Sequence, residues 1–238
     1  MKRGKILVIR GGAIGDFVLT LPVFAALRTQ FPQAIIEVLG YSHIAELARL
    51  GGWVNDVRSI ESRAMAAFFA EGGDLDPKLS EYLSEFAIII SYLYDPDGIF
   101  RTNVSLVSSA QFIEGPHRPD EKQEIHATDV FLKPLERLAI FDADPVPRLP
   151  MPDKSVRVAK TPHLVFHPGS GSDRKNWPEE HWVWLIHRVI GETSARLTIV
   201  GGEAEGSRMQ RLSGGLPTDR VMVLFQKPLP EVAVWLAG

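Results

Sequence analysis

The chain has 238 residues, of which 45% are hydrophobic and 23% charged, a composition typical of a globular protein with one large domain or two modest ones. Its formal net charge of −3 excludes the broad positive field of a nucleic-acid-binding protein, so any contact with a polyanion must come from local clusters. The absence of cysteine excludes disulfides and thiolate zinc sites, and no stretch approaches the roughly 18 apolar residues of a membrane-spanning helix, so we expect a cytoplasmic protein.

In the first half, short β-branched runs alternate with longer amphipathic segments, which predicts βαβ units and a mostly parallel sheet. The first helix extends from about Ile14 to Gln30 but contains Pro22, so we expect a break near Thr20–Leu21. Another helix is predicted over Thr128–Ile140. The predicted strands are Lys5–Arg10, Ile35–Leu39, Val57–Ile60, Ala87–Ser91 and Gln111–Glu114.

A proline-rich segment, Asp142–Pro162, has few periodic apolar residues and predicts a linker between two domains. We therefore predict an α/β fold with two Rossmann-like, doubly wound domains, at residues 1–155 and 156–238. The second has only about three βα units, so we expect an unpaired strand edge and an uncovered apolar face that favours self-association. Its predicted strands are His163–His167, Arg196–Val200 and Arg220–Leu224, and its predicted helices are Pro178–Ile190, Ala204–Leu212 and one that begins at Leu229.

The turn after the first strand contains Gly11, Gly12 and Gly15, and glycine-rich turns allow backbone N–H groups to face an anion at the start of a helix. Arg10 occupies the first position of the dinucleotide-binding fingerprint, which disfavours binding of NAD or FAD. Asp16 has two interpretations that the local sequence leaves open. It caps the helix dipole, or it projects into a crevice as a general base.

Two further turns follow strands in the second half. In the first, Ser170, Ser172 and Lys175 could hold phosphate oxygens, although a plain surface loop has the same composition. In the second, Glu205 follows a pair of glycines and either accepts hydrogen bonds from ribose hydroxyls or complements the start of a helix. Ligands bind at the carboxyl edge of open α/β sheets, so the agreement of three such turns favours a binding site there.

Three arginines near predicted strand ends are candidate contacts for an anionic acceptor, although exposed arginines are usually just solvated. They are Arg58, Arg63 and Arg101. We predict no metal site, because four histidines show no metal-ligand spacing with acidic residues: His117, His126, His181 and His187.

The segment Ile9–Pro22, continued by Ala26–Arg28 and Phe31–Pro32, resembles the opening signature of glycosyltransferase family 9, the ADP-heptose:lipopolysaccharide heptosyltransferases. Three later segments are similar to the same family, so the resemblance extends along essentially the whole chain. They are His126–Asp129, the loop His167–Pro178, and the turn Gly201–Gly202 followed by Glu205.

This resemblance implies a GT-B enzyme with two facing Rossmann-like domains that uses an ADP-sugar donor, needs no metal or other cofactor and inverts the anomeric centre. Asp16 is similar to the family's catalytic carboxylate and Glu205 to its ribose contact, while Ser170, Ser172 and Lys175 look like its diphosphate contacts. The implied acceptor is a lipid-linked, anionic saccharide of the lipopolysaccharide inner core, at the cytoplasmic face of the inner membrane.

The chain departs from the family in one respect. Family members continue with an Asp-Ser-Gly segment, a histidine and a helix that closes on the donor, and nothing here resembles them, so we expect a truncated enzyme that transfers sugar poorly or not at all. Two alternatives belong to other classes: a catalytically inert binding module, and, less favoured, an NAD-dependent oxidoreductase built on the first glycine-rich turn.

Overall fold

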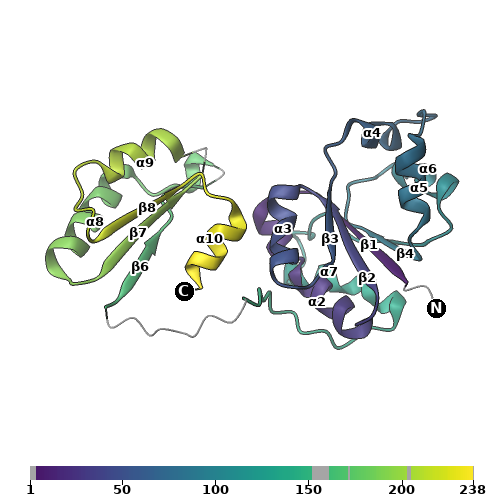
Figure 1. Ribbon diagram of the computed structural model, residues 1–238, viewed down its shortest axis with the longest axis horizontal. Helices are drawn as coiled ribbons and strands as arrows, with labels where there is room; N and C mark the ends of the chain where they lie inside the picture. Colours follow the sequence, from purple (N-terminus) through teal and green to yellow (C-terminus); the bar gives the residue numbers. More distant parts are fainter. Residues whose placement is uncertain (1–3, 152–160, 171, 203–204, 238) are drawn as a thin grey trace. The chain divides into compact units, whose positions relative to one another are not determined.

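A computed structural model of the chain describes residues 4–151, 161–170, 172–202 and 205–237. The chain divides into two units, Met1–Pro152 and Asp153–Gly238 (Figure 1), and each is described by itself. The boundary predicted at residues 155–156 lies outside the described residues, as does most of the predicted linker. Its described part, residues 142–151, contains neither helix nor strand.

The first unit contains a five-stranded parallel sheet. Its strands are β1 (Lys5–Arg10), β2 (Ile35–Gly40), β3 (Asp56–Ser59), β4 (Ile88–Ser91) and β5 (Gln111–Glu114), and they lie in the order β3-β2-β1-β4-β5. The central strands are rich in buried isoleucine, valine and leucine, as expected for a parallel sheet that is covered on both faces. All five predicted strands are confirmed to within one residue at either end.

Helices cover both faces of this sheet (Figure 1). One face carries α4 (Arg63–Ala66), the 3₁₀ helix η1 (Ala67–Phe69), α5 (Pro77–Ser84) and α6 (Ile99–Val107), and the other carries α2 (Leu21–Gln30), α3 (Ser42–Leu50) and α7 (Ala127–Leu132). On the first face, Leu7 of β1 belongs to one buried cluster with Phe68 and Phe100. Because side chains alternate along a strand, Ile6 and Val8 point to the other face, where they are also buried.

The predicted break in the first helix is confirmed. Helix α1 covers Ile14–Val18, and α2 begins at Leu21 with Pro22 in its first turn, where a missing N–H costs no helical hydrogen bond. The Thr20 hydroxyl donates to the backbone oxygen of Asp16 at 2.8 Å and holds the two helices at the junction.

The single helix predicted over Thr128–Ile140 is wrong beyond Leu132. There α7 gives way to a 3₁₀ helix, η2 (Lys133–Leu138), which ends at Ala139 with a φ of 58°. The physical reason is Pro134, which has no N–H to donate to the carbonyl of Val130 and whose ring crowds that carbonyl.

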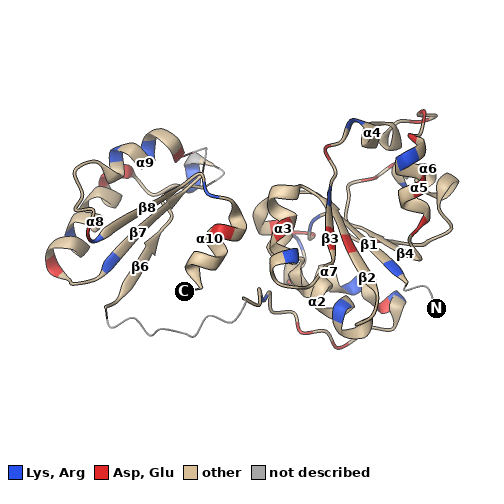
Figure 2. Cartoon of the chain, in the orientation of Figure 1, with Lys and Arg blue, Asp and Glu red and all other residues tan. Residues whose placement is uncertain are grey.

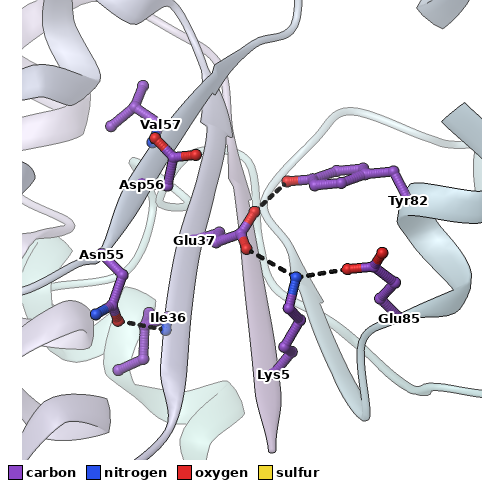
Figure 3. A network of polar contacts seen from close by, with 8 residues as sticks. All are labelled: Lys5, Ile36, Glu37, Asn55, Asp56, Val57, Tyr82 and Glu85. Carbon is purple, nitrogen blue, oxygen red and sulfur yellow. Dashed lines mark hydrogen bonds and ion pairs between the residues drawn. The ribbon is translucent and has the colours of Figure 1, made fainter. Parts of the chain in front are cut away.

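A charged residue in the interior strand β2 is satisfied by partners from two other elements (Figure 3). Glu37 is 8% exposed, and it accepts from the Lys5 ammonium at 3.3 Å and from the Tyr82 hydroxyl at 2.9 Å. Lys5 also pairs with Glu85 at 2.5 Å. Buried charges are tolerated when they are paired and hydrogen-bonded in this way, so we assign this network to the fold.

The second unit contains a three-stranded parallel sheet, in the order β6-β7-β8. Its elements are β6 (His163–Phe166), the 3₁₀ helix η3 (Asp173–Lys175), α8 (Glu179–Glu192), β7 (Arg196–Gly201), α9 (Gly206–Ser213), β8 (Val221–Phe225) and α10 (Leu229–Leu236). The three predicted strands and the start of the last helix are confirmed to within one residue. The predicted helix start at Ala204 lies outside the described residues.

The edge strands of this sheet are less covered than its central strand, β7. On one face, Leu197 and Ile199 of β7 pack with Ile186 of α8 and Met209 of α9. The register places Val165, Thr198 and Met222 on the other face. There, Val165 remains 39% exposed and Met222 remains 50% exposed. On the packed face, Leu164 of β6 and Val223 of β8 are likewise 37% and 39% exposed, so the two edge strands are partly open on both faces.

Charges of both signs occur on both units (Figure 2), in line with the small net charge of the chain. None of the helices in the described part of the chain is long and apolar enough to cross a membrane.

Candidate active site

The loop from β1 to α1 holds the carboxylate of Asp16 at the carboxyl edge of the first sheet. Asp16 is half-buried in the first turn of α1, and its Oδ2 accepts from the backbone N–H of Ala13 at 3.1 Å. Gly12 has a φ of 96°, and a Cβ there would come within 2.9 Å of Asp16 Oδ2, so this position requires glycine. Nothing within 4 Å would meet a Cβ at Gly15, which shows that space is open there.

Both interpretations of Asp16 fit this geometry. Oδ2 satisfies a free N–H at the start of the helix, as a capping carboxylate does. No described residue donates a hydrogen bond to Oδ1, so this oxygen is available to accept a proton from a ligand.

Arg10 fixes this loop from inside the sheet. Its side chain is 2% exposed, and it donates to the backbone oxygens of His117 at 2.8 Å, Asp16 at 3.3 Å and Tyr92 at 3.5 Å. The guanidinium also lies 4.5 Å from the ring centroid of Phe131. Burial lowers the pKa of Arg10, and the nearby Asp16 acts in the opposite direction.

The hydrogen bonds from Arg10 to three backbone oxygens were not predicted from the sequence, where Arg10 was considered only as a departure from a glycine fingerprint. The available signal was a charged residue at the end of an otherwise apolar strand, since such a residue, once buried, must have partners.

A cavity of about 260 Å³ lies at the carboxyl ends of β4 and β5. Its wall combines aromatic, apolar and acidic side chains, namely Ser91, Leu93, Tyr94, Asp95, Pro96, Phe112, Glu114, Gly115, Pro116 and His117. Burial lowers the pKa of His117, Arg118 and Arg10 act in the same direction, and Asp16 opposes them.

The three candidate arginines do not form one cluster. Arg58 on β3 lies over the ring of Tyr82, 4.2 Å from its centroid. Arg101 on α6 pairs with Glu114 at 3.1 Å, and Glu114 belongs to β5, at the opposite edge of the sheet from β3. Arg63 is exposed at the start of α4. Of the three, only Arg101 contacts a residue of the cavity wall.

In the second unit, the loop after β6 folds on itself. The Ser170 hydroxyl donates to the backbone oxygen of Ser172 at 2.8 Å and accepts from its N–H at 3.3 Å. The N–H of Lys175 donates to the same Ser172 oxygen at 3.0 Å. The side chain of Lys175 is exposed, and no described residue forms an ion pair or hydrogen bond with its ammonium.

Glu205 joins this loop to the turn after β7. It is 8% exposed, and its Oε2 accepts from the N–H of Gly202 at 2.8 Å. Its carboxyl group also lies so close to Gly169 that any Cβ there would overlap it. The structure therefore brings Ser170, Ser172, Lys175 and Glu205 to the carboxyl edge of β6 and β7.

The start of α8 is held by charged and aromatic contacts that the sequence argument did not identify. Glu179 accepts two hydrogen bonds from Arg211, at 2.7 and 2.8 Å, and Arg211 lowers the pKa of this carboxyl. Trp177 stacks on His181 with ring centroids 5.1 Å apart. These contacts anchor the far end of the loop that carries Lys175.

A search of the described residues for groups of three or more His, Cys, Asp or Glu side chains that could hold a metal ion found none.

Comparisons with known proteins agree with this arrangement. Residues 123–238 match the family model described as glycosyltransferase family 9 (heptosyltransferase). A family 9 glycosyl transferase from Veillonella parvula is similar in structure, with a TM-score of 0.71 and 15% identity over 97% of this chain and 72% of that one.

Two Escherichia coli structures are also similar. Heptosyltransferase WaaC with ADP gives a TM-score of 0.68 at 20% identity, covering 98% of this chain and 79% of that one. ADP-heptose LPS heptosyltransferase II gives a TM-score of 0.68 at 17% identity, covering 98% of this chain and 76% of that one. No curated protein sequence matches. The predicted α/β, GT-B-like fold and the resemblance to family 9 are confirmed.

Proposed function

We propose, from the match of residues 123–238 to the model of glycosyltransferase family 9, that the protein is an inverting, metal-independent glycosyltransferase that moves a heptose-type sugar from an ADP-sugar to a lipopolysaccharide inner-core acceptor. The observation that carries the proposal is the carboxylate of Asp16. One of its oxygens is fixed by the N–H of Ala13 at 3.1 Å, and its other oxygen has no donor among the described residues.

In this proposal the first unit supplies the base. Asp16 accepts the proton of an acceptor hydroxyl while the hydroxyl oxygen attacks the anomeric carbon of the donor. A new C–O bond forms on one side of that carbon as the bond to the diphosphate breaks on the other, which inverts the anomeric centre. The electron pair of the broken bond leaves with ADP.

The second unit holds the leaving group in this proposal. The Lys175 ammonium, which no described residue neutralises, and the loop around Ser170 and Ser172 stabilise the negative charge that develops on the diphosphate. Glu205 holds the ribose hydroxyls. One of its oxygens is already fixed by Gly202, so the carboxyl group is oriented before the nucleotide binds.

The acceptor in this proposal is lipid-linked and anionic, and the protein meets it at the cytoplasmic face of the inner membrane. Support for the donor comes from the similar E. coli proteins, one with ADP and one described as an ADP-heptose LPS heptosyltransferase. The exposed Arg58 and Arg63 are candidate contacts for charged groups of the acceptor.

The test is a transfer assay with the 238-residue chain, ADP-heptose and a lipid A–Kdo acceptor, with EDTA present. We expect ADP release that depends on the acceptor but is slow, with any glycosylated product, detected by mass spectrometry, showing an inverted anomeric configuration by NMR. ADP binding that is lost in Lys175→Ala without any transfer would favour a nucleotide-binding module instead. Failure to bind ADP, with or without divalent cations, would refute the proposal, and a thermal shift with NAD would favour the oxidoreductase alternative.

A further inference from the structure

The cavity at the carboxyl ends of β4 and β5 adjoins the loop of the proposed base. The guanidinium of Arg10 donates to the backbone oxygen of Asp16 at 3.3 Å and to that of His117, a cavity residue, at 2.8 Å. A second contact also links the cavity to this loop. A Cβ at Gly11 would lie 3.6 Å from the side chain of Leu93, which lines the cavity. A ligand in the cavity would therefore lie beside the Asp16 loop.

An aromatic platform forms one part of the cavity wall. The ring of Tyr94 is 68% exposed and lies 4.7 Å from the ring of His117, centroid to centroid. Phe112, Pro96 and Pro116 add apolar surface. A large exposed aromatic face beside a cavity is suited to packing against the C–H face of a flat ligand ring.

The charges of the wall exclude one class of ligand. Its ten lining residues include two carboxylates, Asp95 and Glu114, and neither lysine nor arginine. Asp95 accepts from the N–H groups of Phe100 and Arg101, so its carboxylate is used to begin α6. An anion in this cavity would meet Glu114 and the capped Asp95, and the nearby cation Arg101 is already paired with Glu114, so no described residue of the wall is free to attract it.

Glu114 is the carboxylate that remains available to a ligand. Its side chain is 54% exposed, and Arg101 holds its Oε1 at 3.1 Å. No described residue donates to its Oε2. A carboxylate oriented by an arginine and open on one side is a hydrogen-bond acceptor for hydroxyl groups.

The cavity has room for a ring-sized ligand. Its volume of about 260 Å³ is well above the roughly 30 Å³ of one water molecule.

We propose that this cavity binds a single neutral, hydroxyl-rich ring, with Tyr94 as its packing platform and Glu114 as its hydrogen-bond acceptor. This inference rests on the proposed function, in which the bound ring is a neutral sugar of the acceptor that lies beside the Asp16 loop. Any anionic group of the acceptor then lies outside the cavity. Arg101 is a positioning residue that orients Glu114, and it does not bind the acceptor's charge.

The test measures binding of two probes to the whole chain by ligand-observed NMR, without donor. One probe is the neutral methyl glycoside of a heptopyranose, and the other is the anionic methyl glycoside of Kdo. We expect the neutral probe to bind at least about tenfold more tightly than the anionic one, and Tyr94→Ala to weaken its binding about tenfold. Glu114→Gln should weaken the neutral probe severalfold and strengthen the anionic one.

Phe141→Ala is the matched control, because Phe141 is 69% exposed, belongs to the same unit and does not line the cavity. It should leave both affinities within about twofold of the wild-type values. The proposal is wrong if the anionic probe binds more tightly, if Tyr94→Ala behaves like Phe141→Ala, or if the neutral probe does not bind to the wild-type chain.

Failure of this inference can be distinguished from failure of the proposed function. If acceptor-dependent transfer occurs and Tyr94→Ala leaves the acceptor KM unchanged, the transferase survives and the cavity assignment does not. If the neutral probe binds as expected but ADP does not bind, the cavity assignment survives and the transferase does not.

Discussion

The two units use the same kind of parallel sheet but cover it differently. In the first, helices pack on both faces, and Leu7, Val8 and Ile9 of the central strand have no exposed surface. In the second, one face packs against α8 and α9, while Met222 on the other face is half exposed. In a sheet that is covered on both faces, a buried side chain such as Arg10 can hold the loops at the strand ends in place. In a partly covered sheet, the loops are less constrained. The more constrained first unit is therefore the better place for a base that must be held in position, as we propose for Asp16. The less constrained second unit can still attract a diphosphate through the charge of Lys175.

The largest expected effect concerns the base. Asp16→Asn should lower kcat roughly 10²- to 10⁴-fold, because the amide cannot accept the proton, and should leave the affinity for ADP unchanged. The amide oxygen can still accept from Ala13, so the loop should keep its fold. Steady-state kinetics and calorimetric titration of ADP provide the two measurements.

Asp129→Asn is the matched control, because Asp129 also lies in the first turn of a helix of the first unit. Equal losses of kcat in both variants would show that helix capping, and not proton transfer, explains Asp16.

The next largest effect concerns packing. Phe100 is fully buried and packs with Phe68 and Phe69, so Phe100→Ala should lower the free energy of unfolding of the first unit by about 3–5 kcal/mol. Met222→Ala should change the stability of the second unit by only about 0.5 kcal/mol, because half of that side chain is already exposed. Hydrogen exchange followed by mass spectrometry resolves each unit separately. A large loss with Met222→Ala would contradict the open face of β8.

A smaller effect is expected for donor binding. Lys175→Ala should raise the Kd for ADP about tenfold, and Lys175→Arg should restore part of the affinity, because the cation is kept. Lys227→Ala serves as the control in the same unit, since Lys227 pairs with Glu231. Equal ADP affinities of the Lys175→Ala variant and the wild-type chain would remove the phosphate role from this loop.

The smallest effect concerns alkaline pH. Burial and the neighbouring Glu37 raise the pKa of Tyr82 well above its ordinary value of 10. The folded chain therefore keeps a proton that the unfolded chain loses, so this stabilisation is complete below about pH 10 and is lost as the pH rises further. Tyr82→Phe should be less stable by about 1 kcal/mol at neutral pH, because the hydrogen bond to Glu37 is gone.

Urea denaturation between pH 8 and pH 11 measures this difference. The wild-type chain should lose more stability over that range than Tyr82→Phe does, and parallel losses would show that Tyr82 does not titrate differently in the folded state.

Local patterns predicted the elements well, because strand alternation, glycine-rich turns and the proline at residue 22 act over a few residues. The same reasoning extended α7 past Pro134, although the signal was present in the sequence. Contacts between distant segments were beyond its reach. Arg10 meets the backbone oxygens of Tyr92 and His117, which are 82 and 107 residues away.

The sheet order was also beyond local patterns. It places β3, which carries Arg58, and β5, whose Glu114 pairs with Arg101, at opposite edges of the sheet, so the three arginines that were grouped by position along the chain do not form one cluster. The roles of Asp16, Ser170, Ser172, Lys175 and Glu205, and the domain boundary at residues 155–156, stay predictions.

The buried guanidinium of Arg10 constrains how this sequence can change over time. Three segments far apart in the sequence, the start of α1 and the loops after β4 and β5, present backbone carbonyls to one cation, so an insertion or deletion in any of them would leave a buried carbonyl without its donor. Apart from Gly12 and Asp16, side chains on these segments can vary as long as the backbone path is kept. We therefore expect that relatives which retain this arginine also retain the lengths of all three segments, while the residues that face the ligand differ among them.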